Sequence, residues 1–300
     1  MEAEVTTTES NLDVFQQHRG LLFGAAYRLL GSAADAEDVV QEAWLRFAEV
    51  PLEEVREPRA YLLRTVTNLA LNQIRSQQRR REEYVGPWLP EPVSSLPDTA
   101  AAPAPDEAAV LADDVSLAML VVLEQLSPLE RAAYILGEVF GYPAPEIAST
   151  LDRSPAAVRQ LMSRARAHVA SRQARNQVDP ALHKRITEQF LRAASTGVVE
   201  PLLGLLAPDV VLTSDGGGQK SAALRPILGV EKVLRFLLGV TSKPDTPFQL
   251  HVAEVNGLPA LVAVDADGAV DTVASFRIDG GLVREIYLVR NPDKLRRIHV

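Results

Sequence analysis

The sequence contains no cysteine, and this absence excludes disulfide bonds and thiolate metal ligands. Its five histidines are scattered, and no two stand at the helical spacing of a metal-binding pair. The longest apolar runs, such as Leu117–Leu123, are far shorter than the roughly 20 residues of a membrane-spanning helix. The acidic start Met1–Ser10 lacks the basic region and apolar run of a signal peptide. We therefore expect a cytoplasmic protein with no membrane segment, metal or cofactor.

Positive charge is also scarce, because the formal net charge is −8 at pH 7. Proteins that coat nucleic acid unaided gain their affinity from Lys and Arg, so this balance argues against such a function. The charge is unevenly distributed. Residues 1–54 hold eleven acidic side chains against three arginines, whereas residues 153–175 hold six arginines and no acid. An acidic region and a basic region on one chain indicate two kinds of partner.

The chain divides into four segments by pattern and composition. Apolar residues recur at helical spacing from Leu12 to about Arg81, and again from about Val115 to Arg175. Six prolines between residues 87 and 105 lie among Ala, Ser and Asp and predict an extended linker. The predicted segments are a helical domain at 11–81, the linker at 82–112, a second helical domain at 113–177 and a further domain at 180–300.

The last segment mixes helical and alternating patterns. Amphipathic helices are predicted at His183–Thr196 and Val230–Leu238. Turn dipeptides such as Asn256-Gly257 separate the alternating runs and favour hairpins. The predicted strands are Val210–Thr213, Leu250–Val255, Leu261–Val264, Thr272–Ile278 and Val283–Val289. This order predicts an α+β domain in which helices cover one face of a curved antiparallel sheet.

Residues 145–169 have the form of a helix-turn-helix. A short helix at Glu146–Leu151 is followed by a turn, by Ser154 as an N-cap and by Pro155 at the first helical position. The apolar stripe predicted to be buried in the second helix is Val158, Leu161, Ala165 and Val169. Arginine and glutamine side chains beside it suit base edges and phosphates. An amphipathic helix with a solvated arginine face is the alternative.

Four motifs resemble those of bacterial sigma factors of the extracytoplasmic-function type, in the same order and spacing. They are DAEDVVQEAWLR at 35–46, PRAYLLRTVTNLALN at 58–72, SPLER at 127–131 and AVRQLMSRAR at 157–166. The resemblance covers residues 12–175. It implies two all-α domains, a sigma region 2 bundle and a sigma region 4 helix-turn-helix, on a subunit that carries no catalytic residue because RNA polymerase performs the chemistry.

The resemblance also implies the partners, which are the clamp helices of core RNA polymerase and promoter DNA. The residues implied for polymerase binding are Asp35, Glu37, Asp38, Gln41 and Glu42. Those implied for the minus-ten element are Tyr61, Asn68, Asn72, Arg75, Arg79 and Arg80. Those implied for the minus-thirty-five element are Ser154, Arg159, Gln160, Ser163, Arg164 and Arg166. Without the resemblance, favourable helix-end charges and polar surface residues are the alternatives for the first two sets.

Residues 183–300 resemble the SnoaL-like, NTF2-like fold, a curved-sheet cone around a pocket, through RPILGVE at 225–231. WLPEP at 88–92, DGGG at 215–218 and NPDKL at 291–295 further resemble the ECF41 or SigJ-like group of sigma factors. That group usually has lysine directly after the glycines, whereas this chain has Gln219 and then Lys220. In that group the fused tail regulates the sigma factor in place of a separate anti-sigma protein.

The residues implied for this regulation lie in the linker and the tail. They are Trp88, Leu89, Pro90, Glu91, Pro92, Asp215, Gly216, Gly217, Gly218, Asn291, Pro292, Asp293, Lys294 and Leu295. A Pro-rich segment with one large aromatic residue suits a groove, and glycines permit close backbone approach. The alternatives are a tryptophan packed on its own domain, a flexible glycine loop and a simple turn.

Two other functions remain open at this point. The tail could be an enzyme, or bind a small molecule without turning it over, with Asp215, His251, Asp265 and Asp271 as its polar candidates. A filled cone would instead favour a structural clamp. The whole chain could also be a free-standing DNA-binding regulator, which the net charge disfavours and a gel shift with and without polymerase would test.

Overall fold

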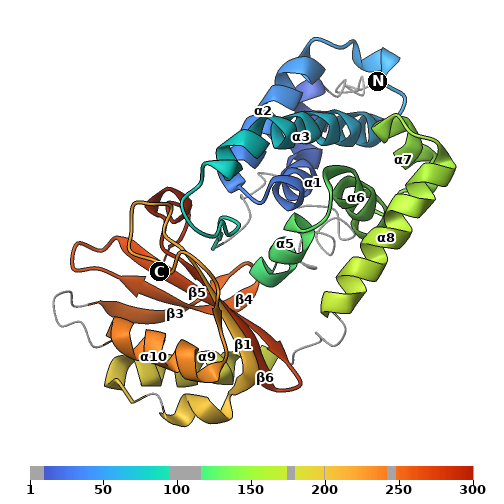
Figure 1. The fold of residues 1–300 in the computed structure, drawn as a ribbon. Coiled ribbons are helices and arrows are strands. Elements are labelled where there is room, and N and C mark those ends of the chain that lie inside the picture. Colours follow the sequence, from blue (N-terminus) through green and yellow to red (C-terminus); the bar gives the residue numbers. More distant parts are fainter. Residues whose placement is uncertain (1–9, 95–115, 174–179, 199, 242–247, 300) are drawn as a thin grey trace, which may run out of the picture. The chain divides into compact units, whose positions relative to one another are not determined.

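The computed structural model describes residues 10–94, 116–173, 180–198, 200–241 and 248–299. The side chains of residues 78–82, 173 and 241 lie outside that description. The described residues form two compact units, and each is described by itself (Figure 1). Unit 1 contains most of the helices before residue 167, and unit 2 contains the sheet, its helices, the described linker residues up to 94 and the helix around residue 120.

Unit 1 begins with α1 (Asn11–Leu30), α2 (Ala33–Ala48), the short η1 (Leu52–Glu54) and most of α3 (Pro58–Glu82). A capping box at Ser10 starts α1, and Gly31 in the left-handed conformation ends it. The Ser32 side chain then caps α2. Leu22, Phe47 and Leu62 are fully buried, as the helical spacing of apolar residues predicts.

The same unit continues with α6 (Pro128–Tyr134), the π-helical turn η2 (Ile135–Val139), α7 (Ala144–Leu151) and most of α8 (Pro155–Gln173). The buried Arg131 donates a 2.6 Å hydrogen bond to the carbonyl oxygen of Leu29, and this bond ties α6 to α1. Removal of a charged donor from water requires such a partner. The two helical segments are therefore packed together within unit 1.

Unit 2 contains a six-stranded sheet in the order β2-β1-β6-β5-β4-β3. The strands are β1 (Leu206–Asp215), β2 (Ile227–Leu228), β3 (Gln249–Val255), β4 (Leu258–Val264), β5 (Val270–Asp279) and β6 (Leu282–Val289). The predicted antiparallel meander is confirmed for β3 to β6. The expectation of a purely antiparallel sheet is wrong, because β1 runs parallel to β6. The long connection from β1 to β6 leaves either direction open, unlike a hairpin turn.

The two faces of the sheet carry different layers. Alternation along β6 sends Ile286 and Leu288 to one face, and Tyr287 and Val289 to the other. The first face is covered by α9 (Pro180–Thr196), η3 (Glu200–Gly204) and α10 (Val230–Thr241), as predicted (Figure 1). The second face packs against linker residue Leu89 and against α5 (Leu117–Glu124). Apolar residues therefore cover both faces of the sheet. On the second face, Leu89 and Leu117 come from outside residues 180–300.

The helices within the described residues include none with the length and apolar character needed to cross a membrane.

Candidate functional site

The exposed surface of α2 carries most of the residues expected to meet polymerase. Asp38, Gln41 and Glu42 are exposed, and Glu42 forms a 3.0 Å ion pair with Arg46 one turn later. Asp35 differs, because it is half-buried and accepts a 3.0 Å hydrogen bond from Gln73. It therefore ties α2 to α3.

Leu45, which is not among the residues expected to bind polymerase, is 54% exposed on the same helix. It stands four residues after Gln41, so helical spacing alone could have placed it on the stripe that begins at Asp38. Glu37 is half-buried. The surface is thus an acidic patch with one apolar side chain at its end, and not a purely charged one.

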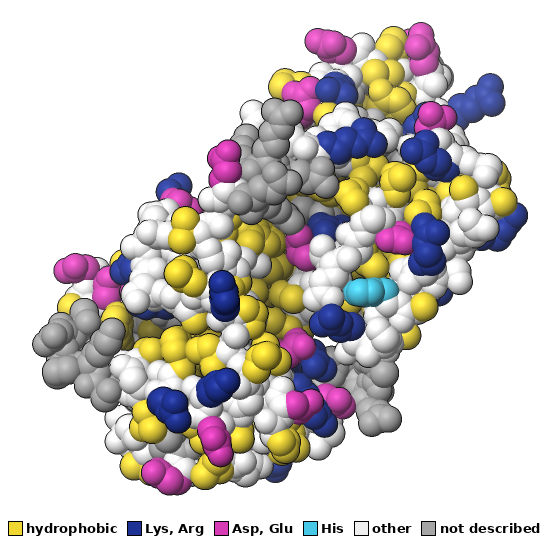
Figure 2. All heavy atoms as spheres, viewed as in Figure 1, with side chains coloured by type: hydrophobic (Ala, Val, Ile, Leu, Met, Phe, Trp, Pro, Cys, Tyr) yellow, Lys and Arg dark blue, Asp and Glu magenta, His cyan; other side chains and the backbone are white. Residues whose placement is uncertain are grey.

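One face of α3 carries the residues expected at the minus-ten element. Asn68 and Asn72 line one groove of about 390 Å³ together with Arg64 and Arg75, which confirms that the two amides share a side of the helix. In Figure 2, dark-blue Lys and Arg side chains lie over α3 and beside α7. Arg75 donates a 3.4 Å hydrogen bond to the Asn72 side chain. Arg79 and Arg80 belong to α3, but their side chains are outside the described part.

A second hollow of about 250 Å³ adjoins this groove, because Arg64 and Asn68 line both. Tyr61 lines the second hollow, and its ring packs against Phe47 with centroids 5.9 Å apart. The half-buried tyrosine is thereby fixed next to the asparagine. The predicted set at this face is brought together on a single side of α3, apart from the two arginines without described side chains.

The helix-turn-helix has the geometry that the sequence predicts. Asp152 adopts a left-handed conformation with φ of 53°, and the Ser154 hydroxyl accepts a 3.2 Å bond from the Ala157 backbone NH. The predicted stripe Val158, Leu161, Ala165 and Val169 is buried. The predicted DNA-facing residues Ser154, Arg159, Gln160, Ser163, Arg164 and Arg166 are exposed.

Two arginines of α8 have carboxylate partners that are distant in sequence. Arg164 pairs with Glu130 of α6 at 2.7 Å, and Arg166 pairs with Glu138 of η2 at 2.7 Å. Hydrogen bonds from the Ser127 hydroxyl first, and then from Arg164, lower the pKa of Glu130. The segment without acids is therefore partly neutralised in three dimensions. Promoter phosphates would have to compete with these glutamates.

The linker residues 84–94 are bound within unit 2 to residues of the tail, and Asp215 at the end of β1 is the centre of this contact. The Asp215 side chain is 0% exposed, so its charge needs partners inside the protein. One carboxylate oxygen accepts bonds from Lys294 Nζ (2.7 Å) and the Leu89 backbone NH (2.8 Å). The other accepts bonds from the Tyr84 hydroxyl (2.6 Å) and the Gly217 backbone NH (3.0 Å). We call the group Tyr84, Trp88, Leu89, Asp215 and Lys294 the linker clamp.

Lys294 connects the rest of the linker clamp. Its ammonium group also donates a 2.6 Å bond to the Leu89 carbonyl, and it lies 4.0 Å from the centroid of the Trp88 ring and 4.9 Å from that of Tyr84. A cation between two aromatic faces in a dry environment is strongly held. Burial, followed by the hydrogen bond to Asp215, raises the pKa of the Tyr84 hydroxyl, which therefore stays a donor.

Further contacts hold the linker beyond Leu89. Leu89, Pro90, Glu91, Pro92 and Val93 are all buried. The Val93 backbone pairs with Asn256 through bonds of 2.8 and 3.3 Å, and Ser94 accepts a 2.9 Å bond from the His299 backbone NH. Glu91 forms a 3.5 Å ion pair with Arg297.

Several of these partners were not predicted. Tyr84, Asn256 and Arg297 lie outside the recognised motifs, although Tyr84 is an aromatic residue just before the Pro-rich segment. That position was the available signal for Tyr84. Asn291, which was predicted, donates a 2.8 Å bond to the Tyr84 hydroxyl and caps η4 (Pro292–Lys294).

The glycines after Asp215 lie in close contact with their surroundings. A Cβ atom at Gly216 would lie 2.2 Å from the Lys220 carbonyl oxygen, and one at Gly217 would lie 2.4 Å from Asn291 Nδ2. Gly217 also has φ of +60°, a region that favours glycine. The backbone here therefore has no room for a side chain.

We expect Gly217→Ala to destabilise unit 2 and to loosen the linker clamp. The left-handed backbone would cost about 1–3 kcal/mol, and displacement of Asn291 would add to it. The matched control is Gly268→Ala, with φ of +82° and nothing within 4 Å of the added Cβ. Urea unfolding measures both losses, and Trp88 fluorescence reports the linker. Equal losses with unchanged fluorescence would contradict the assigned contact.

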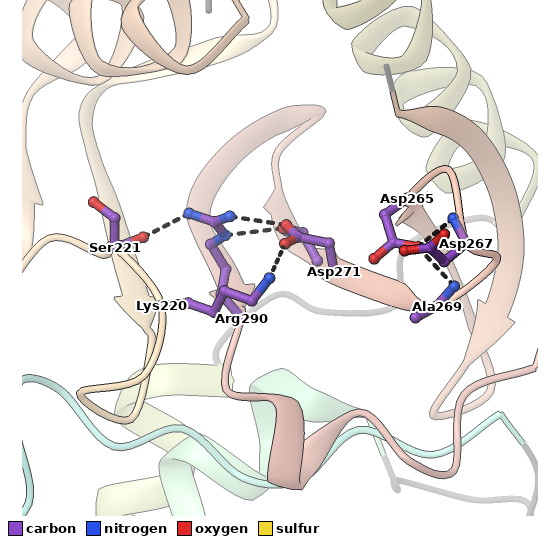
Figure 3. A network of polar contacts seen from close by, with 8 residues as sticks. Lys220, Ser221, Asp265, Asp267, Ala269, Asp271 and Arg290 are labelled. Carbon is purple, nitrogen blue, oxygen red and sulfur yellow. Dashed lines mark hydrogen bonds and ion pairs between the residues drawn. The ribbon is translucent and has the colours of Figure 1, made fainter. Parts of the chain in front are cut away.

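The lysine that follows the glycines does not join the linker clamp. Lys220 instead forms a 2.9 Å ion pair with Asp271, which Arg290 also binds at 2.9 Å (Figure 3). Arg290 further donates a 2.6 Å bond to the Ser221 carbonyl, and this bond holds the loop between β1 and β2. Burial alone would raise the pKa of Asp271, but hydrogen bonds from Lys220, Thr272 and Arg290 lower it. Gln219, at the usual lysine position, donates a 2.7 Å bond to Asp293.

The polar candidates for an enzyme do not form one site. Asp215 and Asp271 are neutralised in separate networks, and Asp265 accepts bonds from the backbone NH groups of Asp267 and Ala269 (3.1 and 2.9 Å; Figure 3). His251 lies on β3 opposite Val262. Between sheet and helices, the residues form one apolar cluster that includes the ring pair Phe190 and Phe276. No three His, Asp or Glu side chains among the described residues are grouped as a metal site.

Comparisons with known proteins agree with this architecture. The pattern of the family "Sigma-70 region 2" matches residues 14–80, and that of "Sigma-70, region 4" matches residues 116–169. The first range includes the acidic surface and the α3 face, and the second includes the helix-turn-helix. The fold and these two regions define a sigma factor, which is not an enzyme.

Relatives extend the match to the tail. The chain is 38% identical over 294 residues to the ECF RNA polymerase sigma factor SigJ of Mycobacterium tuberculosis (strain ATCC 25618 / H37Rv), covering 95% of this chain and 92% of that protein. It is 31% identical to the probable ECF sigma factor SigI of the same strain, covering 94% and 93%. The crystal structure of M. tuberculosis SigJ aligns with a TM-score of 0.74 and 34% identity, covering 94% of this chain and 97% of that one.

The chain therefore belongs to the family of ECF RNA polymerase sigma factors, which bind core RNA polymerase and promoter DNA and direct transcription to promoters. The helical regions followed by a mixed six-stranded sheet with helices correspond to the SigJ structure. The predicted fold class is thereby confirmed, with a C-terminal α+β region as an addition to the sigma regions.

Proposed function

We propose that the tail regulates this sigma factor by binding the linker, in place of a separate anti-sigma protein. The observation that carries the proposal is the buried ion pair of Asp215 and Lys294, which encloses the Leu89 backbone and the Trp88 ring. The linker connects the segments that we assign to region 2 (residues 11–81) and region 4 (residues 113–177). Linker residues 84–94 have a fixed path when they are bound in this way, and this restricts the spacings that the two promoter readers can adopt.

The tail of residues 180–300 supports a structural clamp better than a sensor or an enzyme. The apolar cluster between α9, α10 and the sheet occupies the interior of the predicted SnoaL-like cone. The four polar candidates are spread over separate hydrogen-bond networks, as described above. The tail can therefore regulate the sigma factor through the second face of the sheet, where Leu89 and α5 pack, without a small-molecule ligand.

We assign the contacts with polymerase and promoter to surfaces described above. Asp38, Gln41, Glu42 and the apolar Leu45 present a mixed surface that suits the clamp helices of polymerase in the cytoplasm. The α3 face suits an unstacked minus-ten base, because asparagine amides both donate and accept. The exposed side of α8 suits the minus-thirty-five element.

Trp88→Ala in the full chain tests the regulation. Loss of the cation–π contact removes about 1 kcal/mol or more from linker binding, which raises the ratio of released to bound linker about fivefold. We therefore expect promoter-specific transcription by purified core polymerase to change about fivefold. Phe248→Ala is the control, because this tail residue is an exposed aromatic that is 41% accessible. A chain that ends at Gln177 is a second arm, although it uncovers Leu89 and Leu117.

The outcomes separate the possible roles of the tail. Unchanged transcription with Trp88→Ala and with the shortened chain, on a library of promoters, would reject regulation by the tail. A gel shift without polymerase tests the remaining alternative, a free-standing DNA-binding regulator. Tight duplex binding in that assay would support the alternative, against the expectation from the negative net charge.

A further inference from the structure

The groove on α3 has a second wall that comes from the helix-turn-helix. Residues 149–153, at the end of α7 and in the following turn, face Arg64, Asn68, Asn72 and Arg75 across about 390 Å³. All of these residues belong to unit 1. A hollow of this size lies in the range of small-ligand sites, whose volumes begin at about 300 Å³. The free chain thus has a cavity between α3 and the helix-turn-helix, which we assign to different promoter elements.

The cavity has an excess of positive charge. Arg64, Arg75 and Arg153 line it, against the single carboxylate of Asp152. In the described part of the chain, none of the three guanidinium groups forms an ion pair: Arg75 bonds to the Asn72 amide and Arg153 to a backbone carbonyl. Neighbouring cations without counter-charges repel one another, and an anion between them relieves that repulsion.

The walls also offer groups that suit a nucleobase. The side chains of Asn68 and Asn72 are exposed into the groove, and each amide both donates and accepts hydrogen bonds. Leu71, Leu129 and Leu151 add apolar surface to the same lining. The groove therefore combines three kinds of group. Its guanidinium groups suit phosphates, its amides suit the edge of a base, and its leucines suit the face of a base.

We propose that this groove binds a phosphorylated nucleotide in the polymerase-free chain. Arg64, Arg75 and Arg153 contact its phosphates, and Asn68 and Asn72 contact its base. The ligand bridges α3 and the turn after α7, so it holds the two walls together. If the α3 face reads the minus-ten element, as proposed above, the nucleotide competes with the promoter strand for the same amides. Only this last consequence rests on the proposed function.

Calorimetric titration of the full chain, without polymerase or DNA, tests the binding itself. The probes are GTP and ATP, with guanosine as a base without phosphates and tripolyphosphate as phosphates without a base. We expect saturable binding of at least one triphosphate, and binding at least about tenfold weaker for guanosine and for tripolyphosphate, since each lacks one set of contacts. No saturable binding of either triphosphate would overturn the proposal. Tripolyphosphate that binds as tightly as the triphosphates would also overturn it, because the base would then make no contact.

Two variants separate the site from general electrostatics. Arg153→Ala should weaken triphosphate binding at least about tenfold, because it removes one phosphate contact. Arg56→Ala makes the same change of charge at an exposed residue outside the groove lining, and binding should stay unchanged. Equal loss in both variants would overturn the site. Arg153 is not among the residues assigned to promoter reading, so a negative titration leaves the transcription experiment with Trp88→Ala untouched.

Discussion

Lys294→Met is expected to lower the free energy of unfolding of unit 2 by about 3–5 kcal/mol, because it leaves a buried carboxylate without its cation. The Asp215 side chain is 0% exposed and the Lys294 side chain is 11% exposed, so water cannot solvate the carboxylate that is left unpaired. Methionine retains the length of the side chain and most of its packing. The loss therefore reports the ammonium group, its bond to the Leu89 carbonyl and its contact with Trp88. Urea unfolding followed by far-ultraviolet circular dichroism measures it.

A double-mutant cycle with Asp215→Asn isolates the ion pair from the rest. Each single change leaves one partner unmatched, whereas the double change removes both charges. The double variant should therefore lose less than the sum of the two single variants, by about 0.5–3 kcal/mol. Hydrogen exchange of residues 84–94 should rise in both single variants, because the Leu89 backbone bonds to both side chains.

Lys220→Met is the matched control for Lys294→Met. Lys220 also pairs with a buried aspartate, but its own side chain is 42% exposed and Asp271 keeps Arg290 as a second cation. We expect a loss of no more than about 1 kcal/mol and no change in exchange of the linker. Equal destabilisation by the two lysine variants would contradict the central place of Lys294 in the linker clamp.

The sequence was sufficient for the features that depend on neighbouring residues. The Ser154 cap, the following Pro155 and the buried stripe from Val158 mark the recognition helix by local spacing, and the structure has each of them. Turn dipeptides such as Asn256-Gly257 likewise placed the strands of the meander. Capping and turn geometry are short-range effects, so they can be read from a few adjacent residues.

The features that could not be predicted depend on residues far apart in the chain. Tyr84 bonds to Asp215 and Asn291 across 131 and 207 positions, and no local pattern records such a pairing. The same reason explains the missed parallel pairing of β1 with β6, and the glutamates that neutralise Arg164 and Arg166. The motifs at 88–92, 215–218 and 291–295 were recognised as a set only by resemblance. Burial of Asp215 then supplies the physical reason why they belong together.

The interior of the cone provides the other large expected effect. Phe276 is 3% exposed and its ring centroid lies 4.6 Å from that of Phe190. Phe276→Ala should destabilise unit 2 by about 3–5 kcal/mol, through lost apolar burial and the cavity that remains. Phe248→Ala, at the exposed phenylalanine, should cost less than about 1 kcal/mol. Urea unfolding measures both changes, and equal losses would contradict a filled interior.

Benzene provides a second readout of the same variant. An apolar cavity of this kind stays dry and accepts benzene, so benzene should raise the melting temperature of Phe276→Ala and leave the parent chain unchanged. Benzene that stabilises the parent equally would reveal an existing cavity and favour the ligand-binding alternative for the tail.

Phe276→Ala also distinguishes two ways in which the tail could act on transcription. Phe276 belongs to the apolar cluster between the helices and the sheet. In the linker clamp, Leu89 packs on the other face of the sheet and Asp215 lies at the end of β1. Below the melting temperature of the variant, the linker stays bound and transcription should match that of the parent chain. Above it, the sheet unfolds and the linker is released, so transcription should change in the same direction as with Trp88→Ala. A change already present in the folded variant would instead assign regulation to the interior of the cone.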